Sequence, residues 1–278
     1  MLLITGATGN VGGYVCDLLS LQNQPFLKAS SRKRDDPQTR WLDFLKPESF
    51  HHALKGITTV FLVRPPALAN PGRDMLPFLM TCRDQGIQKI VFLSLQGADT
   101  IAVTPHAKIE KCIVELGIPF VFLRPSFFMQ NLTMQQCADI RDHDEILVPA
   151  GRGRTNFIDA RDIAESAVRC LTDSALRNRA LTLTGSNSYT YDAVAELLTQ
   201  ALGRPIHYRK PGLLPYIIRT RKKGHPLGYA VITGLIFTMA RLGKASGSSQ
   251  DMVHLLGRSP RTLEEFIKEH ALLWNPNT

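Results

Sequence analysis

Three glycines near the amino terminus constrain the fold of this chain more than any other feature. Met1 to Thr5 is a short apolar run, and it leads directly into Gly6-Ala7-Thr8-Gly9-Asn10-Val11-Gly12. A helical pattern of apolar residues begins at Val11. In such a turn the first glycine permits the bend, the second lets backbone N–H groups approach a pyrophosphate, and the third lets the helix pack closely on the strand. The spacing therefore predicts that residues 6–12 hold a dinucleotide at a helix N-terminus.

The next 115 or so residues alternate short apolar runs with helical patterns, joined by turn-rich connections. Such alternation requires right-handed crossovers and a parallel sheet covered on both faces. The predicted fold class is α/β, a doubly wound parallel sheet of the Rossmann type with a smaller C-terminal α/β region on the substrate side. We expect strands at 25–31, 40–44, 58–63, 89–95 and 120–123, and helices at 46–55, 75–84 and 105–116.

The end of the second expected strand indicates which dinucleotide is bound. An NAD-preferring site places Asp or Glu there for the ribose 2′-hydroxyl. Here the chain reads Ser30-Ser31-Arg32-Lys33-Arg34, with no carboxylate before Asp35. Hydroxyls and a guanidinium suit a 2′-phosphate, so NADP(H) is the expected cofactor, and an exposed basic turn is the alternative. Ligands of doubly wound sheets lie outside the carboxyl ends of the strands. The contacts expected beyond the phosphate loop are Ser31, Arg32, Lys33, Asp43, Phe44, Val63, Arg64, Pro65 and Ser94.

The second half of the chain is less regular. We assign residues 1–155 to the NADP-binding domain, with strand and helix contributions from about 156–185, and residues 186–278 to a smaller substrate-side domain. Helices are expected at 159–171, 190–202 and 262–273 and a strand at 180–184, with Asp159 and Asp162 as caps of the first helix. Residues 207–250 are expected to be irregular. Their apolar run 227–240 is shorter than the roughly 20 residues that span a bilayer, which favours a buried helix or a pocket wall.

The net charge of +9 comes from one segment. Between Leu197 and Gln250 there are nine Lys and Arg residues and no Asp or Glu, so the rest of the chain is balanced. A local positive field attracts anionic substrates, acidic lipids or polyanions, and a solvated basic face is the plainer alternative. We expect Arg221, Lys222 and Lys223 to form an exposed loop, and residues 197–250 to give weak association with membrane surfaces. No nucleic-acid-binding motif is present, so no nucleic-acid partner is expected.

The five cysteines are an odd number and include no Cys-x-x-Cys pair. They predict reduced thiols rather than a metal site or a disulfide framework. No signal peptide precedes the first expected strand. We therefore expect a cytoplasmic protein.

Three further segments carry a resemblance to a known family. Together with the first glycine loop, Phe122-Leu-Arg-Pro-Ser-Phe-Phe-Met-Gln-Asn131, Phe157-Ile-Asp-Ala-Arg-Asp-Ile-Ala164 and Gly257-Arg-Ser-Pro-Arg-Thr-Leu-Glu-Glu-Phe266 resemble the atypical short-chain dehydrogenases of the NmrA-like type. The resemblance covers essentially the whole chain. It is strongest to the quinone-oxidoreductase and triphenylmethane-reductase branch. That family includes NAD(P)H-dependent reductases and also transcription co-regulators that bind the nucleotide without turning it over.

The resemblance also bears on catalysis. Glu110 matches the usual Glu of the helix after the fifth strand, which puts His106 at the place of the superfamily's catalytic lysine and Ala102 at that of its tyrosine. The tyrosine acid is therefore missing. His106 is the candidate catalytic residue and a cofactor contact, able to hydrogen-bond or to donate a proton near neutral pH, unless it only caps its helix. Phe128 and Asn131 are expected at the nicotinamide side.

These observations favour an NADPH-dependent reductase that transfers hydride to a quinone or a similar conjugated acceptor, for which the missing acid is no obstacle. One alternative is a regulatory protein that senses NADP(H) and binds a protein partner. Another is a sugar-nucleotide epimerase or reductase, with the basic segment taking the diphosphate. The expected partners are a small acceptor and, at most, a second copy of the chain.

Overall fold

The computed structural model describes residues 1–68 and 70–276, and it divides the chain into two compact units. The first contains Met1–Pro125, Ala160–Leu183 and Asp251–Arg258. The second contains Ser126–Asp159, Thr184–Gln250 and Ser259–Thr278. The two units are thus more interleaved along the chain than a boundary near residue 155 implies, since 126–155 lies in the second unit and 251–258 in the first.

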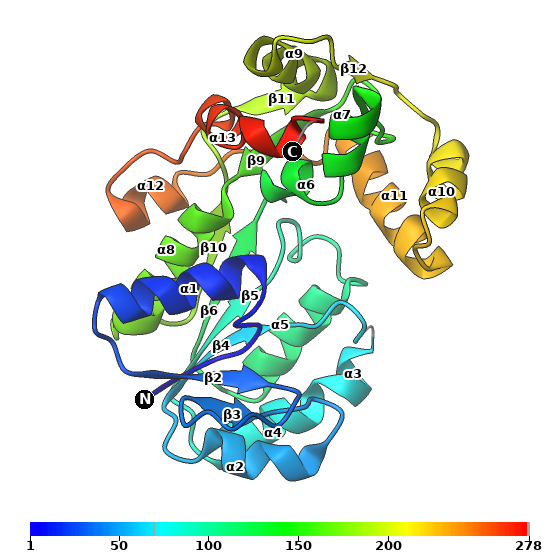
Figure 1. Ribbon diagram of the computed structural model, residues 1–278. Coiled ribbons are helices and arrows are strands. Elements are labelled where there is room, and N and C mark those ends of the chain that lie inside the picture. The colour runs from blue at the N-terminus through cyan, green and yellow to red at the C-terminus, as the bar shows by residue number, and fades with distance from the viewer. Residues whose placement is uncertain (69, 277–278) are drawn as a thin grey trace. The chain divides into compact units, whose positions relative to one another are not determined.

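A seven-stranded sheet forms the centre of the first unit (Figure 1). All its neighbouring strands are parallel, which confirms the predicted doubly wound α/β fold class. The order β10-β6-β5-β4-β1-β2-β3 runs outward in both directions from the pair β1 and β4, and this reversal is where such sheets bind ligands. The strands are β1 (Leu2–Ile4), β2 (Phe26–Ser30), β3 (Thr39–Trp41), β4 (Thr59–Val63), β5 (Lys89–Leu93), β6 (Phe120–Pro125) and β10 (Arg179–Leu183).

Helices cover both faces of this sheet. On one face α1 (Asn10–Leu21) packs against α8 (Ala160–Thr172). The other face carries α2 (Phe50–Leu54), α4 (Leu76–Asp84) and α5 (Pro105–Glu115), with α3 (Pro71–Asp74) beside α5. The 3₁₀ turn η1 (Pro47–Ser49) precedes α2, and α12 (Asp251–Leu256) contacts α8 and β10. Because both faces are covered, β4 and β5 are almost entirely buried, which explains their apolar residues 60–63 and 90–93.

The second unit contains two small sheets and most of the remaining helices. β9 (Arg154–Ile158) pairs in parallel with β7 (Phe127–Phe128) and antiparallel with β11 (Ser188–Thr190). β12 (His207–Tyr208) pairs with β8 (Glu145–Ile146). Aromatic side chains fill the core, with Phe157, Tyr191, Phe266 and Trp274 fully buried. The helical elements are α6 (Gln130–Thr133), α7 (Cys137–His143), α9 (Tyr191–Leu202), α10 (Leu213–Lys222), α11 (Leu227–Arg241), α13 (Leu263–Glu269) and the 3₁₀ turn η2 (Ala271–Trp274).

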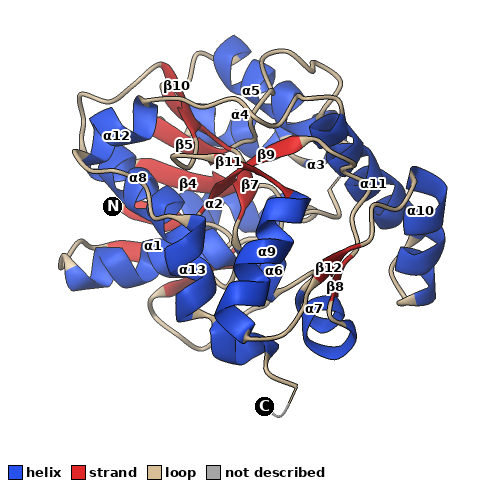
Figure 2. Cartoon of the chain, turned by 90° about the horizontal axis from the view of Figure 1, so that it is seen from above, coloured by secondary structure: helices blue, strands red, loops and turns tan. Residues whose placement is uncertain are grey.

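The expectation that residues 207–250 are irregular is wrong, because α10 and α11 form a helical hairpin there (Figures 1 and 2). Within this segment α11 covers the apolar run 227–240, for which a helix was one of the two favoured structures. Gly234 lies where the two helices meet: a Cβ at this position would stand 2.6 Å from Cδ1 of Leu213. The glycine therefore permits close packing and does not break the helix. None of the helices in the described part of the chain has the length and apolar character of a membrane span.

The expected exposed loop at 221–223 is also wrong. Arg221 and Lys222 belong to the last turn of α10, where cations interact favourably with the negative end of the helix. Lys223 caps that helix and pairs with Asp139 at 2.5 Å. The turn itself follows at Gly224, whose φ of +88° suits glycine.

Five of the nine cations in the 197–250 segment have acidic partners. Asp139 and Glu145, both largely buried in the second unit, take Arg209, Arg219 and Lys223. Buried carboxylates require such partners, so these cations stabilise the fold and are not free to attract a ligand. The other two pairs are Arg204 with Asp144 and Lys210 with Asp192.

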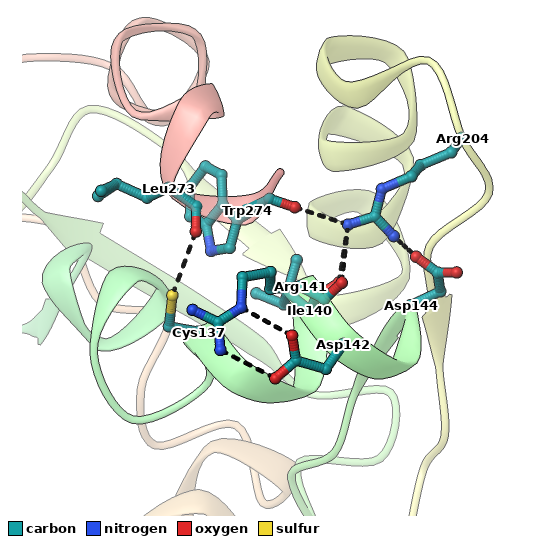
Figure 3. A network of polar contacts seen from close by, with 8 residues as sticks. All are labelled: Cys137, Ile140, Arg141, Asp142, Asp144, Arg204, Leu273 and Trp274. Carbon is teal, nitrogen blue, oxygen red and sulfur yellow. Dashed lines mark hydrogen bonds and ion pairs between the residues drawn. The ribbon is translucent and has the colours of Figure 1, made fainter. Parts of the chain in front are cut away.

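Arg204 shows how these pairs join distant parts of the second unit (Figure 3). Its guanidinium pairs with Asp144 and donates to the carbonyl oxygens of Ile140 and Trp274, at 3.1 and 2.8 Å. The end of α9 is thereby held to α7 and to the C-terminal turn η2. On the same side of α7, the thiol of Cys137 faces the carbonyl oxygen of Leu273.

Candidate functional site

The turn between β1 and α1 has the geometry that the glycine spacing predicts. Gly6 has a φ of +64°, and its carbonyl oxygen accepts a 2.9 Å hydrogen bond from the N–H of Gly9. A Cβ at Gly12 would stand 2.1 Å from that same oxygen. The first turn of α1 therefore lies directly on the backbone of the loop, and only hydrogen fits between them.

The N-terminus of α1 is well suited to an anion. Gly9 is its N-cap and has no side chain to cap the helix, and the first turn contains no acidic residue. A Cβ at Gly9 would stand 3.2 Å from the Gly6 oxygen, which is tight but within reach of a small adjustment. Backbone N–H groups and the positive end of the helix dipole thus meet at an approachable surface.

A cavity of about 1060 Å³ opens beside this loop, entirely within the first unit. Its walls come from the carboxyl ends of β1, β2 and β4 and from the segment after β3. Of the residues expected at the cofactor, the structure places Gly6, Ala7, Thr8, Gly9, Ser31, Arg32, Asp43, Phe44, Val63, Arg64 and Pro65 in this lining. It does not place Asn10, Val11, Gly12, Lys33, Ser94, His106 or Phe128 there.

The turn after β2 forms a basic rim of the cavity. Arg32 and Arg34 both line it, and the hydroxyl of Ser30 accepts a hydrogen bond from the N–H of Arg32. The ammonium of Lys33 instead lies over the ring of Trp41, 4.7 Å from its centroid. The indole N–H of Trp41 donates to the carbonyl oxygen of Ser31, so the Trp41 side chain holds the turn after β2 in place. Trp41 and Arg34 were not among the expected contacts.

Arg64 organises the loop that follows β4. One nitrogen of its guanidinium donates to the carbonyl oxygens of Pro65, Pro66 and Leu68, at 2.9–3.1 Å. Burial lowers the pKa of this guanidinium from its ordinary value. The side chain therefore holds the cavity wall in place while its positive charge stays close to the site.

Ser94 and Glu110 belong to a buried polar cluster at the end of β5. The Ser94 hydroxyl donates to Glu110 at 2.5 Å, and the guanidinium of Arg124 donates to both oxygens of the same carboxylate. Arg124 also pairs with Asp99 at 3.0 Å. This cluster joins β5, α5 and β6, so Glu110 fixes the position of α5 relative to the carboxyl ends of these two strands.

His106 lies one turn before Glu110 on the same face of α5. Its ring stacks on Phe92, with centroids 5.9 Å apart, and among the described residues its Nδ1 has no hydrogen-bond partner. Thr104 caps the helix through the N–H of Ala107, so capping is not the role of His106. Burial, and after it the charge of Arg64, lowers the pKa of His106 to about 4. The ring is therefore neutral near pH 7, where it can take part in hydrogen bonds but is a weak proton donor.

Phe128 and Asn131 lie in the second unit, on β7 and α6. Asp159, expected with Asp162 as a cap, directly precedes α8, and Asp162 lies in the first turn of that helix. Asp159 is fully buried and accepts a hydrogen bond from Gln130 at 3.0 Å. Asp162 pairs with Arg258 at 2.6 Å, inside the first unit.

Three comparisons with known proteins give a consistent result. The model of the NmrA-like family matches residues 30–267. An NAD(P)H azoreductase from Xenophilus azovorans is 31% identical and covers 98% of both chains. Prestalk A differentiation protein A from Dictyostelium discoideum is 30% identical over 96% of this chain and 91% of its own. The solved structure of an Escherichia coli NADPH-dependent quinone oxidoreductase in complex with NADPH has a TM-score of 0.87 at 22% identity, with 97% of this chain and 99% of that one covered.

The two glycines at the start of α1 predict opposite consequences of substitution. Gly12→Ala should lower the free energy of unfolding by about 2 kcal/mol or more, because its Cβ collides with loop backbone. Gly9→Ala should cost less than about 1 kcal/mol and weaken dinucleotide binding at least about tenfold. Urea unfolding and fluorescence titration measure the two effects. Equal loss of stability in both variants would contradict this assignment.

The buried imidazole predicts a specific dependence of stability on pH. The folded pKa of His106 is about 4 and the unfolded one about 6.5, so the unfolded chain takes up the proton first. The neutral imidazole therefore contributes fully to the free energy of unfolding above about pH 6.5. This contribution is lost as the pH falls towards 4, and the loss between pH 7 and 5 is about 2 kcal/mol. Urea unfolding of His106→Leu should lack this part of the pH dependence, whereas His254→Leu, at an exposed position, should retain it.

Proposed function

The chain belongs to the NmrA-like family, and from that premise we propose that it is an NADPH-dependent reductase that acts on a quinone or a similar conjugated acceptor. The observation that carries the proposal is the cavity beside the glycine loop, with its basic rim and no carboxylate at the end of β2. The azoreductase and the quinone oxidoreductase among the similar proteins support the same reaction class.

The residues of the first unit fit NADPH part by part. The N-terminus of α1 suits the pyrophosphate, because its N-cap Gly9 carries no side chain and its first turn carries no acidic residue. Arg32, together with the hydroxyl of Ser31, suits the 2′-phosphate. Asp43 and Phe44 follow β3 in the same cavity wall, where an adenine can lie. When bound, NADPH supplies the hydride.

The acceptor class follows from the proton chemistry that the chain offers. Ala102 occupies the expected place of the acid, and His106 is neutral at pH 7. Neither residue can deliver a proton as a cation or a phenol. A neutral imidazole can still donate a hydrogen bond to an acceptor oxygen or nitrogen. Such a site suits an acceptor whose reduced form is a stabilised anion that takes its proton from water, as a quinone does when hydride addition leaves a phenolate.

A regulatory protein that senses NADP(H) is the second candidate. Its support is the missing acid and the similarity to a protein named for differentiation rather than for an activity. Both candidates need the same cofactor cavity. They differ in turnover, which a redox-sensing protein does not require.

We also propose that the protein is cytoplasmic and associates weakly with anionic membrane surfaces. All five cysteines are free thiols, which suits a reducing compartment. On α10 the side chains of Leu214 and Ile218 are exposed, and Arg221 and Lys222 follow at the spacing of the same helix face. Apolar and basic side chains on one surface favour an anionic bilayer.

The basic rim predicts a preference for NADPH over NADH. Arg32→Ala should remove much of that preference, about 1–3 kcal/mol or roughly 5–150-fold in the ratio of dissociation constants, because a charge-assisted contact to the 2′-phosphate is lost. Affinity for NADH should hardly change. Lys55→Ala removes an exposed charge outside the cavity and serves as the control. Wild-type protein that binds both cofactors equally would refute the assignment.

Turnover separates the reductase from the sensor. We expect wild-type protein to oxidise NADPH in the presence of at least one member of a panel of quinones and azo dyes. His106→Ala should lower kcat about tenfold, the worth of one hydrogen bond of about 1.4 kcal/mol, and leave the affinity for NADPH nearly unchanged. His254→Ala is the matched control. Tight NADPH binding without any turnover across the panel would favour the sensor.

A further inference from the structure

A second cavity, of about 790 Å³, lies wholly within the second unit and is lined by four cations. Arg152 and Arg154 come from the loop before and at the start of β9, Lys210 follows β12, and Arg241 ends α11. Its described lining contains no Asp or Glu. It shares no residue with the cavity beside the glycine loop.

Close packing of backbone fixes this arrangement. A Cβ at Gly153 would stand 2.0 Å from the carbonyl oxygen of Ala240, so only glycine lets the loop lie against the end of α11. Gly151 has a φ of +57°, and its missing side chain leaves room for the aliphatic stem of Arg241, whose Cγ lies 3.1 Å from the Cβ position. The guanidinium of Arg241 is thus held at the cavity wall by contacts along its stem.

Two of the four cations have no acidic partner within the described part of the chain, namely Arg152 and Arg241. Arg154 donates to the hydroxyl and the carbonyl oxygen of Ser188, which leaves its charge uncompensated. Lys210 pairs with Asp192 at 2.8 Å. This differs from the other cations of the second unit that face buried carboxylates, and it leaves about three positive charges around one concave surface.

We propose that this cavity is a binding site for a phosphate-bearing polyanion. Guanidinium groups bind phosphate oxygens through paired hydrogen bonds, and a ligand with two or more negative charges compensates the three free cations. A single carboxylate would leave most of that charge unmatched. The phosphate can come from a soluble diphosphate or from a lipid headgroup, because the chemistry that recognises it is the same.

Isothermal titration with inorganic pyrophosphate at low ionic strength tests the site. The variant Arg152→Gln/Arg241→Gln keeps the aliphatic stems that pack on the loop and removes both charges. We expect wild-type protein to bind pyrophosphate here and the variant to bind at this site at least about tenfold more weakly. A pyrophosphate at the glycine loop of the first unit is unaffected by these substitutions, so the comparison isolates the second cavity.

The matched control is Lys55→Gln/Lys268→Gln, which removes two exposed charges outside both cavities. It should bind pyrophosphate as the wild-type protein does. The two double variants should also unfold at the same thermal midpoint, which shows that they are equally well folded. Equal weakening in both double variants would show a general charge effect and overturn the proposal. Undiminished binding in the arginine variant, or no binding by wild-type protein, would also overturn it.

Co-sedimentation with phosphatidic acid vesicles, compared with phosphatidylcholine vesicles, identifies the source of the phosphate. Capture that depends on Arg152 and Arg241 and is displaced by pyrophosphate assigns the site to a lipid headgroup. Pyrophosphate binding that depends on the same arginines, with vesicle capture that does not, assigns it to a soluble ligand. Both results support the site.

Discussion

The contact between Gly12 and the carbonyl oxygen of Gly6 is the constraint on which the candidate site depends. Because a Cβ at Gly12 would stand only 2.1 Å from that oxygen, the first turn of α1 can lie against the loop backbone only with glycine at this position. Its N-terminus therefore lies at the carboxyl end of β1, beside β4, where the strand order reverses. Thr5 completes the junction, because its hydroxyl donates to Phe61 and accepts from Val63 on β4. Anion recognition and strand order thus rest on the same few backbone atoms.

The chemistry available near this edge is set by which charges are paired. Glu110 is bound by Ser94 and Arg124, so it anchors α5 and is not a free base. His106 lies one turn away, and burial, followed by the charge of Arg64, lowers its pKa. A carboxylate beside the imidazole would have had the opposite effect. The result is a hydrogen-bonding group with little acid strength near pH 7.

Sequence reasoning succeeded where local geometry dominates. The glycine loop, the parallel sheet and its strands follow from spacing and apolar runs that tertiary contacts do not alter. It missed α10, and although it favoured a helix for the apolar run 227–240, it could not show that Gly234 of α11 is needed where the two helices meet. It could not identify Trp41 as the support of the basic turn, since that contact joins two strands. Nor could spacing show that Ser94 is engaged by Glu110.

The excess of positive charge between residues 197 and 250 is a second feature that sequence alone could not interpret, because its effect on binding depends on ion pairs in the folded chain. Counting residues placed nine uncompensated cations between 197 and 250, yet carboxylates elsewhere in the chain, above all Asp139 and Glu145, neutralise several of them. Those carboxylates are buried, so their pairing is obligatory and the cations they hold are unavailable to ligands. The cations left over include Arg241, and it meets Arg152 from outside the segment at a glycine-packed wall. The positive charge available for binding therefore depends on which cations form ion pairs with carboxylates in the folded chain. It remains at the wall where glycine backbone packs closely and Arg152 and Arg241 meet.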